Sequence, residues 1–431
     1  MIDTVMFRRR AWLFIRLSLF VTLLVVVIAP EWPAFGDARF RFQTIVGREY
    51  RFDFLGWSLR ALEDKAQELF SETRRSMPAE TQQEVVLAYL AQLGDVQRIE
   101  AQIERAFSDP TVSDPEVATA DMRAERDELR RDLDARRPLV EDIVQQQVAT
   151  LLNEEGLAVG GVTWPPVMMT MSPVPYMLIL SPRDRIAQID SAALVPGLTT
   201  EDKELMEDAV FDQLDQSALV VPIGGLGTYP AMIRETSSIN WLAEVTAHEW
   251  THHWLSLQPL GIRYLENAQM RTINETVASL VDLEIGPLVI ERYYPEMVPQ
   301  TAASPAPVQP SPVPVFDFPA EMAETRAKVD QLLAEGKIEQ AESYMEQRRR
   351  VFIDNGYNIR KLNQAYFAFY GGYAAEPGGA AGTDPIGPML RDLRQASHSL
   401  RQFLLDVGRV TSFEDLVELH RAKVGPEPAT Q

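Results

Sequence analysis

The chain has 431 residues, of which 46% are hydrophobic, so it can build sizeable cores and wholesale disorder is excluded. Its length predicts roughly two or three folded units. The formal net charge of −21 argues against partners such as nucleic acid and anionic lipid surfaces. Because the chain has no cysteine, disulfides and thiolate metal sites are excluded, and any metal must bind to His, Asp or Glu.

The first 36 residues have a composition of their own. A basic cluster at residues 8–10 precedes a largely apolar run without charged residues at residues 17–29. Counting from Ala11, with Arg16 reaching the interface, gives about the 20 residues that a membrane-spanning helix needs. The layout predicts an N-terminal signal-anchor at residues 1–36, and a cleaved signal peptide has the same layout. Both interpretations place the rest of the chain outside the cytoplasm, because the arginines stay inside.

Residues 37–158 show apolar residues at helical spacing and are predicted to be helical. Their dense mixture of acidic and basic residues is typical of solvated helix faces, or of a helical stalk or partner surface. Short apolar stretches bounded by Gly and Pro begin at Gly160 and predict strands. A helix is expected around residues 199–215, and residues 217–233 read as two strands separated by a glycine-rich turn.

The motif H-E-x-x-H occurs at residues 248–252, and only about 0.01 such matches are expected by chance in a chain with five histidines. The predicted helix 238–257 places His248 and His252 one turn apart on one apolar face. Both imidazoles can then reach one ion at about 2.0–2.1 Å. Glu249, beside them, is well placed to act as general base toward a water. The alternative is a buried core helix whose histidines form hydrogen bonds with the backbone. It requires that several buried polar side chains all find hydrogen-bond partners by chance.

A catalytic zinc usually takes three protein ligands. Glu275 is the best third ligand, and Glu266 is the second choice. In the alternative, Thr272 and Glu275 form a capping box, with Thr272 as the N-cap of a helix and Glu275 at its third position, N3. His253 follows the motif and is expected to point away from the ligand face, as a supporting or surface residue.

The sequence HEWTH, followed by NETVA at residues 274–278, resembles the gluzincin branch of zinc metallopeptidases over roughly residues 224–285. The resemblance implies a zincin-like catalytic core, made of a small sheet and the motif helix. It also implies one Zn²⁺ per chain, held by His248, His252 and Glu275, with Glu249 as general base.

Two further features follow from this resemblance. Residues 224–233 occupy the place of the strand along which the clan often holds an extended peptide by main-chain hydrogen bonds. Some gluzincins orient the first histidine with an Asp four residues after the third ligand. Ser279 stands at that position here, and Asp282, one turn further on, is the candidate instead.

Proline-rich residues 298–319 predict an extended linker, and helical patterns resume over 320–431, with a Gly/Pro break at 377–388. The resemblance implies a tyrosine or histidine that donates to the developing oxyanion. The candidates are three tyrosines at helical spacing and one weaker histidine: Tyr366, Tyr370, Tyr373 and His398. The alternative is that these aromatic side chains belong to the core.

The sequence therefore predicts a predominantly helical α+β fold. Its expected parts are an anchor (1–36), a helical membrane-proximal region (37–158), a zincin-like catalytic core (159–297), a linker (298–319) and a helical C-terminal subdomain (320–431). The predicted function is a membrane-anchored, extracytoplasmic zinc peptidase acting on a peptide or protein substrate. The alternatives are a catalytically silent scaffold or binding protein and a zinc hydrolase of a non-peptide substrate.

Overall fold

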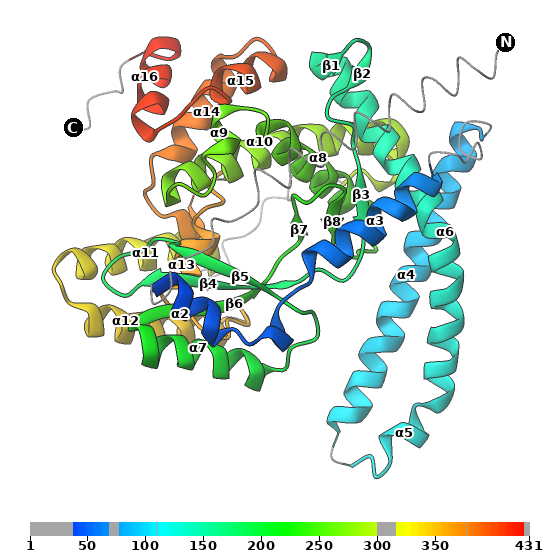
Figure 1. Cartoon of the computed structure of the whole chain (residues 1–431), viewed down its shortest axis with the longest axis horizontal. Helices are drawn as coiled ribbons and strands as arrows, with labels where there is room; N and C mark the ends of the chain where they lie inside the picture. Colours follow the sequence, from blue (N-terminus) through cyan, green and yellow to red (C-terminus); the bar gives the residue numbers. More distant parts are fainter. Residues whose placement is uncertain (1–37, 69–76, 110, 300–315, 377, 426–431) are drawn as a thin grey trace, which may run out of the picture.

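The computed structural model describes residues 38–68, 77–109, 111–299, 316–376 and 378–425 (Figure 1). It is mostly helical with three small sheets, which confirms the predicted helix-rich α+β class. The predicted anchor at residues 1–36 and residues 300–315 of the predicted linker lie outside the described residues. No described helix combines the length and the apolar character that crossing a membrane requires. The predictions of a membrane anchor and of a membrane-bound location are corrected accordingly.

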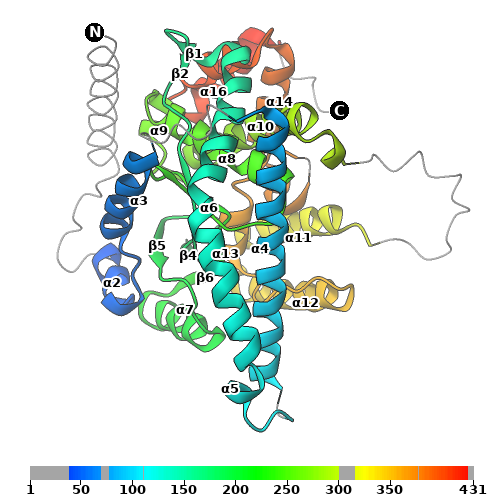
Figure 2. The ribbon, with the colours of Figure 1, turned by 90° about the vertical axis from the view of Figure 1, so that its right-hand side faces the viewer.

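The helices before the sheets form a long hairpin. α2 (Ala38–Ile45) and α3 (Phe54–Glu68) precede α4 (Ala79–Ser108), and the short α5 (Pro115–Ala118) joins α4 to α6 (Ala120–Leu152). α4 and α6 lie side by side in both views, with α5 at the tip (Figures 1 and 2).

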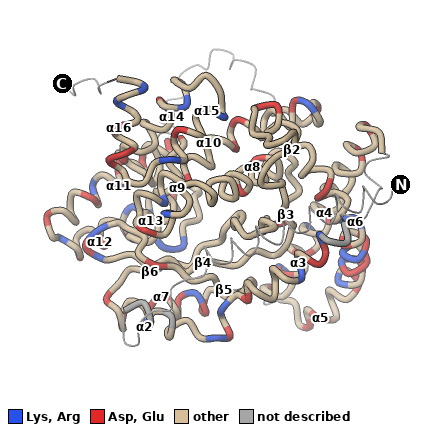
Figure 3. Tube along the Cα trace, turned by 45° about the horizontal axis from the view of Figure 1, so that its top comes forward, with Lys and Arg blue, Asp and Glu red and all other residues tan. Residues whose placement is uncertain are grey.

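The hairpin is amphipathic in the way its sequence predicts. Apolar side chains at helical spacing, such as Leu90 on α4 and Val144 on α6, are buried in the main core. Acidic and basic residues are interspersed along both helices (Figure 3), and Arg130 of α6 pairs with Glu100 of α4 at 2.9 Å. The dense charges of this region are therefore solvated helix faces.

The strands form three sheets. β1 (Ala158–Val159) and β2 (Val162–Thr163) form a hairpin. A second, antiparallel sheet has the order β5-β4-β6, from β4 (Tyr176–Pro182), β5 (Asp190–Leu194) and β6 (Gln216–Pro222). α7 (Thr200–Leu214) and α2 cover one face of this sheet. α7 begins at the N-cap Thr199, which forms a capping box with Asp202.

The third sheet lies next to the motif helix and has the order β3-β8-β7. β3 (Met169–Met171) runs parallel to β8 (Ala231–Ile233), and β7 (Gly225–Leu226) runs antiparallel to β8. The outer edge of β3 is covered by α6, because Glu141 and Gln145 accept hydrogen bonds from the backbone N–H groups of Met171 (2.8 Å) and Met169 (2.7 Å). The opposite edge of the sheet is β7.

Two long helices carry the candidate site. α8 (Ile239–Leu255) begins at the N-cap Ser238, and α10 (Ala268–Tyr293) begins at the N-cap Asn267. α9 (Pro259–Ile262) lies between them in the chain. α8 and α10 pack side by side in the centre of the main core, above the β5-β4-β6 sheet in Figure 1.

The remaining helices divide between two cores. α11 (Phe318–Ala334), α12 (Ile338–Asp354) and α13 (Gln364–Tyr370) surround a cluster of their own, and α13 also covers the second face of the β5-β4-β6 sheet. α14 (Ile386–Ala396), α15 (Leu400–Val407) and α16 (Phe413–Lys423) join α8 and α10 in the main core. The site helices are thus held by the N-terminal hairpin and by the last three helices.

Candidate metal centre

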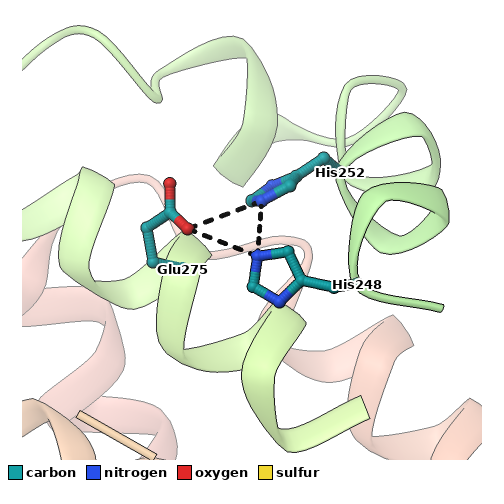
Figure 4. A group of neighbouring side chains, drawn as sticks. All are labelled: His248, His252 and Glu275. Carbon is teal, nitrogen blue, oxygen red and sulfur yellow. Dashed lines mark hydrogen bonds and ion pairs between the residues drawn. The ribbon is translucent and has the colours of Figure 1, made fainter. Parts of the chain in front are cut away.

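Three side chains from α8 and α10 converge on one point (Figure 4). The Nε2 atoms of His248 and His252 are 3.2 Å apart, and each is 3.5 Å from Oε2 of Glu275. The three atoms form a nearly equilateral triangle. An ion bound tetrahedrally at about 2.0–2.1 Å separates its ligand atoms by about 3.3–3.4 Å. The triangle therefore has the size that one metal ion requires.

The two histidines are oriented by hydrogen bonds on their other ring nitrogen. Nδ1 of His248 lies 2.7 Å from Oδ2 of Asp282, and Nδ1 of His252 lies 2.8 Å from Oδ1 of Asn274. Because both partners are oxygen acceptors, each Nδ1 carries the proton and each Nε2 presents its lone pair to the centre. The structure thus places Asp282 where the sequence predicted it. Asn274 was missed, although its position next to Glu275 in NETVA was the available signal.

Glu275 divides its two oxygens between the protein and the centre. Oε1 accepts a hydrogen bond from the hydroxyl of Tyr264, whereas the buried Oε2 has no hydrogen-bond donor among the described residues. Burial raises the pKa of Glu275, but His252, His248 and Arg271 outweigh it and hold the pKa well below its usual value. Glu275 is therefore an anion with one oxygen left for a cation. No sequence pattern pointed to Tyr264.

The pKa of His248 is shifted in the opposite direction to that of Glu275. Burial lowers the pKa of His248, but its contacts with Asp282 and Glu275 prevail and raise the pKa well above the ordinary value. A proton on this ring would satisfy the surrounding carboxylates, and so would a metal ion. The donor set of two imidazoles and one carboxylate could thus hold a cation.

Glu249 lies one residue along the helix from the first ligand and is not part of the triangle. It is only 4% exposed, its Oε2 has no hydrogen-bond partner among the described residues, and burial raises its pKa. A carboxylate with a raised pKa and a free oxygen is suited to accept a proton.

The glycine-rich segment before α8 lies directly against this carboxylate. A Cβ atom at Gly225 would lie 2.2 Å from Oε1 of Glu249, and one at Gly227 would lie 3.2 Å from Cβ of His252. Only glycine lets the backbone approach so closely. Glycine is thus required by the contact between β7 and the site.

His253 holds the same segment in place. It is fully buried, as a supporting residue, and not on the surface. Its Nε2 lies 2.6 Å from the carbonyl oxygen of Thr228, and its ring packs edge-on against Tyr229 at 4.9 Å. Burial lowers the pKa of His253 to about 4, so the ring is neutral and donates this hydrogen bond.

The tyrosine candidates separate in the structure. Tyr366 and Tyr370 pack against each other, with ring centroids 4.5 Å apart, and against the β5-β4-β6 sheet. Tyr373 instead lies beside the ligands, with its ring 6.4 Å from that of His248. Partial burial, and then the charge of Glu275, raise the pKa of Tyr373 well above its ordinary value, so its hydroxyl keeps the proton. His398 is exposed and has no described contact with the centre.

Two sequence-based alternatives fail. Glu266 is directed to Arg263, 2.6 Å away at the surface, and is not in the metal-sized group. The capping-box interpretation of Thr272 is wrong because α10 begins at Ala268, a full turn before it. Glu275 therefore lies inside α10, on the face that is directed toward His248 and His252 of α8.

Comparisons with protein-family models, with curated proteins and with solved structures found no match to this chain. What the centre does must therefore be inferred from its own geometry.

Proposed function

We propose that the protein is a zinc-dependent peptidase with a zincin-like catalytic core. The observation that carries the proposal is the triangle of His248, His252 and Glu275, with the buried carboxylate of Glu249 next to it. Two imidazoles and one carboxylate are a donor set found in catalytic zinc sites, which keep one position open.

The role that we propose for each side chain follows from its contacts in the site. A zinc ion held by His248, His252 and Glu275 would supply an acidified water and polarise the carbonyl group of the scissile bond. Glu249 would accept a proton from the attacking water and pass it to the leaving nitrogen, because its buried carboxylate lies next to the triangle without belonging to it. Asp282 and Asn274 keep the imidazole rings in the tautomer that binds a metal. Tyr373, protonated and beside His248, is the preferred donor to the developing oxyanion, in place of Tyr366 and Tyr370.

A peptide substrate is favoured by the strand next to the general base. β7 forms the edge of its sheet, and its backbone contacts Glu249 at Gly225. An extended peptide paired with such an edge would lie across the metal centre. The hydrogen bond from His253 to Thr228 fixes the segment at the required distance from α8.

The test has two stages. Zinc-loaded protein is incubated with a mixed peptide library, and cleavage products are read by mass spectrometry, with the Glu249→Gln variant as control. We expect cleavage by the wild type and its loss in the variant. A zinc-loaded wild type that cleaves no peptide contradicts the peptidase proposal but leaves a zinc hydrolase of another substrate. A chain that takes up no zinc contradicts both.

A further inference from the structure

Arg271 is a buried cation whose guanidinium forms no close ion pair among the described residues, although its charge acts on Glu275 one turn away. Arg271 lies on α10, one turn before Glu275, and is only 6% exposed. Its guanidinium donates to the carbonyl oxygen of Ala368, at 3.1 Å, and to the hydroxyl oxygen of Tyr264, which uses two of its five N–H groups. Buried charges are normally paired, as Lys65 is with Glu141. The guanidinium therefore has donors left for an anion.

A cavity of about 330 Å³ opens beside this guanidinium. Arg271 and Tyr264 form the wall toward the metal centre, and Tyr264 is the residue that donates to Glu275. Arg41 of α2 and Gln216 at the start of β6 line the cavity from the side of the β5-β4-β6 sheet. The cavity thus adjoins the metal centre through one shared side chain.

The charges around the cavity favour an anionic ligand. Arg41 and Arg271 contribute two positive charges and Asp190 one negative charge, a local excess of cations in a chain with net charge −21. Gln188 and Gln216 also line it, and their buried amide oxygens form no hydrogen bond among the described residues. These oxygens can accept hydrogen bonds from the N–H groups of a bound peptide, whereas the two guanidinium groups supply the donors for its carboxylate.

We propose that this cavity binds a carboxylate of the peptide substrate, held by Arg271 and assisted by Arg41. The inference rests on the proposed peptidase function. Residues one turn apart on a helix lie about 5–6 Å from each other, so Arg271 lies close to the metal ligand Glu275. A carboxylate bound at Arg271 therefore belongs to a substrate residue near the bond that is cleaved at the metal centre. The carboxylate is either an acidic side chain or the free C-terminus of the peptide. A guanidinium suits both because it binds carboxylates in a bidentate manner.

The experiment compares matched peptides that are cleaved at one bond. One pair carries Glu or Gln near that bond, and a second pair has a free or an amidated C-terminus. We expect the wild type to prefer the carboxylate of one pair by about 10- to 100-fold in kcat/KM. A preference in the first pair assigns an acidic side chain to the cavity, and a preference in the second pair assigns the C-terminus. Equal rates within both pairs overturn the proposal.

Variants assign the preference to the cavity. Arg271→Gln should bring the rate ratio close to one, and its zinc content is measured alongside. Arg41→Glu, at an exposed position where folding is not at risk, should lower the ratio by about fivefold at low salt. Arg98→Gln, at an exposed arginine on α4, is the matched control and should leave the ratio unchanged. A ratio that neither cavity variant lowers refutes the assignment.

Failure of the peptidase proposal is distinguished by a binding measurement. If no peptide is cleaved, the cavity is titrated by calorimetry on the zinc-loaded chain with N-acetylglutamate and with N-acetylglutaminamide, which has the same skeleton but no carboxylate. Saturable binding of the first alone, lost in Arg271→Gln, supports the anion site independently of catalysis. Absence of binding to both compounds overturns it.

Discussion

Replacing Gly225 by alanine tests the position of the general base by sterics alone. The new methyl group would lie 2.2 Å from Oε1 of Glu249, whereas ordinary contacts begin at 3.4 Å. The closest atom is the end of a side chain, so the clash can be relieved by turning the carboxylate away by about 1 Å. Gly225 has no left-handed backbone angle, so the substitution adds no backbone strain. The cost should therefore fall on catalysis, with the fold retained.

A displacement of about 1 Å in a catalytic group can lower the rate by about 10²-fold, and this is the loss we expect in kcat/KM for Gly225→Ala. Zinc content should stay at the wild-type level, because Glu249 is not a ligand. Gly227→Ala, whose methyl group would meet Cβ of His252 at 3.2 Å, should lose less activity. Gly94→Ala is the matched control: its Cβ meets Ser237 at 3.4 Å, and it should keep full activity.

The assay is hydrolysis of a fluorogenic peptide taken from the library, with zinc content and thermal unfolding measured on each variant. The reasoning is refuted if Gly225→Ala cleaves as fast as Gly94→Ala. Loss of zinc in Gly225→Ala would also contradict it, since the methyl group would then disturb the ligands.

Three further predictions concern single side chains. Glu249→Gln should keep zinc but lose about 10²–10⁴-fold in activity, whereas Glu275→Gln should bind zinc more weakly; zinc titrations side by side that give the reverse order contradict the assignment. Asp282→Ala should weaken zinc binding by about 10- to 100-fold, measured by competition with a chelator, because His248 loses its acceptor. Burial raises the pKa of Glu207, but Arg360 and Lys361 hold it below the usual value, so its stabilisation is present above about pH 4.5 and lost as the pH falls through the folded-state pKa. Denaturant unfolding of Glu207→Gln should thus show a deficit of about 3 kcal/mol at pH 7 that shrinks in acid, and a deficit independent of pH would refute this.

The local part of the site was predictable from the sequence. Helical spacing alone puts His248 and His252 on one face, and the structure contains that helix as α8. Asp282 follows Glu275 by seven residues, which is two turns of α10, and both lie on the face toward α8. These relations needed only the period of a helix.

The rest depends on where helices end and on distant contacts. The spacing of Tyr366, Tyr370 and Tyr373 predicted one helical stripe, but α13 ends at Tyr370 before two glycines. Tyr373 therefore leaves the stripe and reaches the metal centre, while the other two stay against the sheet.

The contacts of Tyr264 and Arg271 could not be read from their neighbours in the chain. Tyr264 meets Glu275 because the turn after α9 folds back over α10. Arg271 meets Ala368, almost a hundred residues away, through packing of α13. No local pattern encodes such contacts, and the same holds for the division of the strands into separate sheets.

The central claim is that His248, His252 and Glu275 bind one zinc ion. Its most direct test is zinc titration of residues 38–431, freed of metal and monitored by competition with a chromophoric chelator. The proposal predicts close to one tightly bound zinc per chain in the wild type. It also predicts the loss of most of that affinity in His248→Ala and in His252→Ala, with the fold intact. A folded wild-type chain that stays metal-free after reconstitution, or that binds zinc equally well without either histidine, would contradict it.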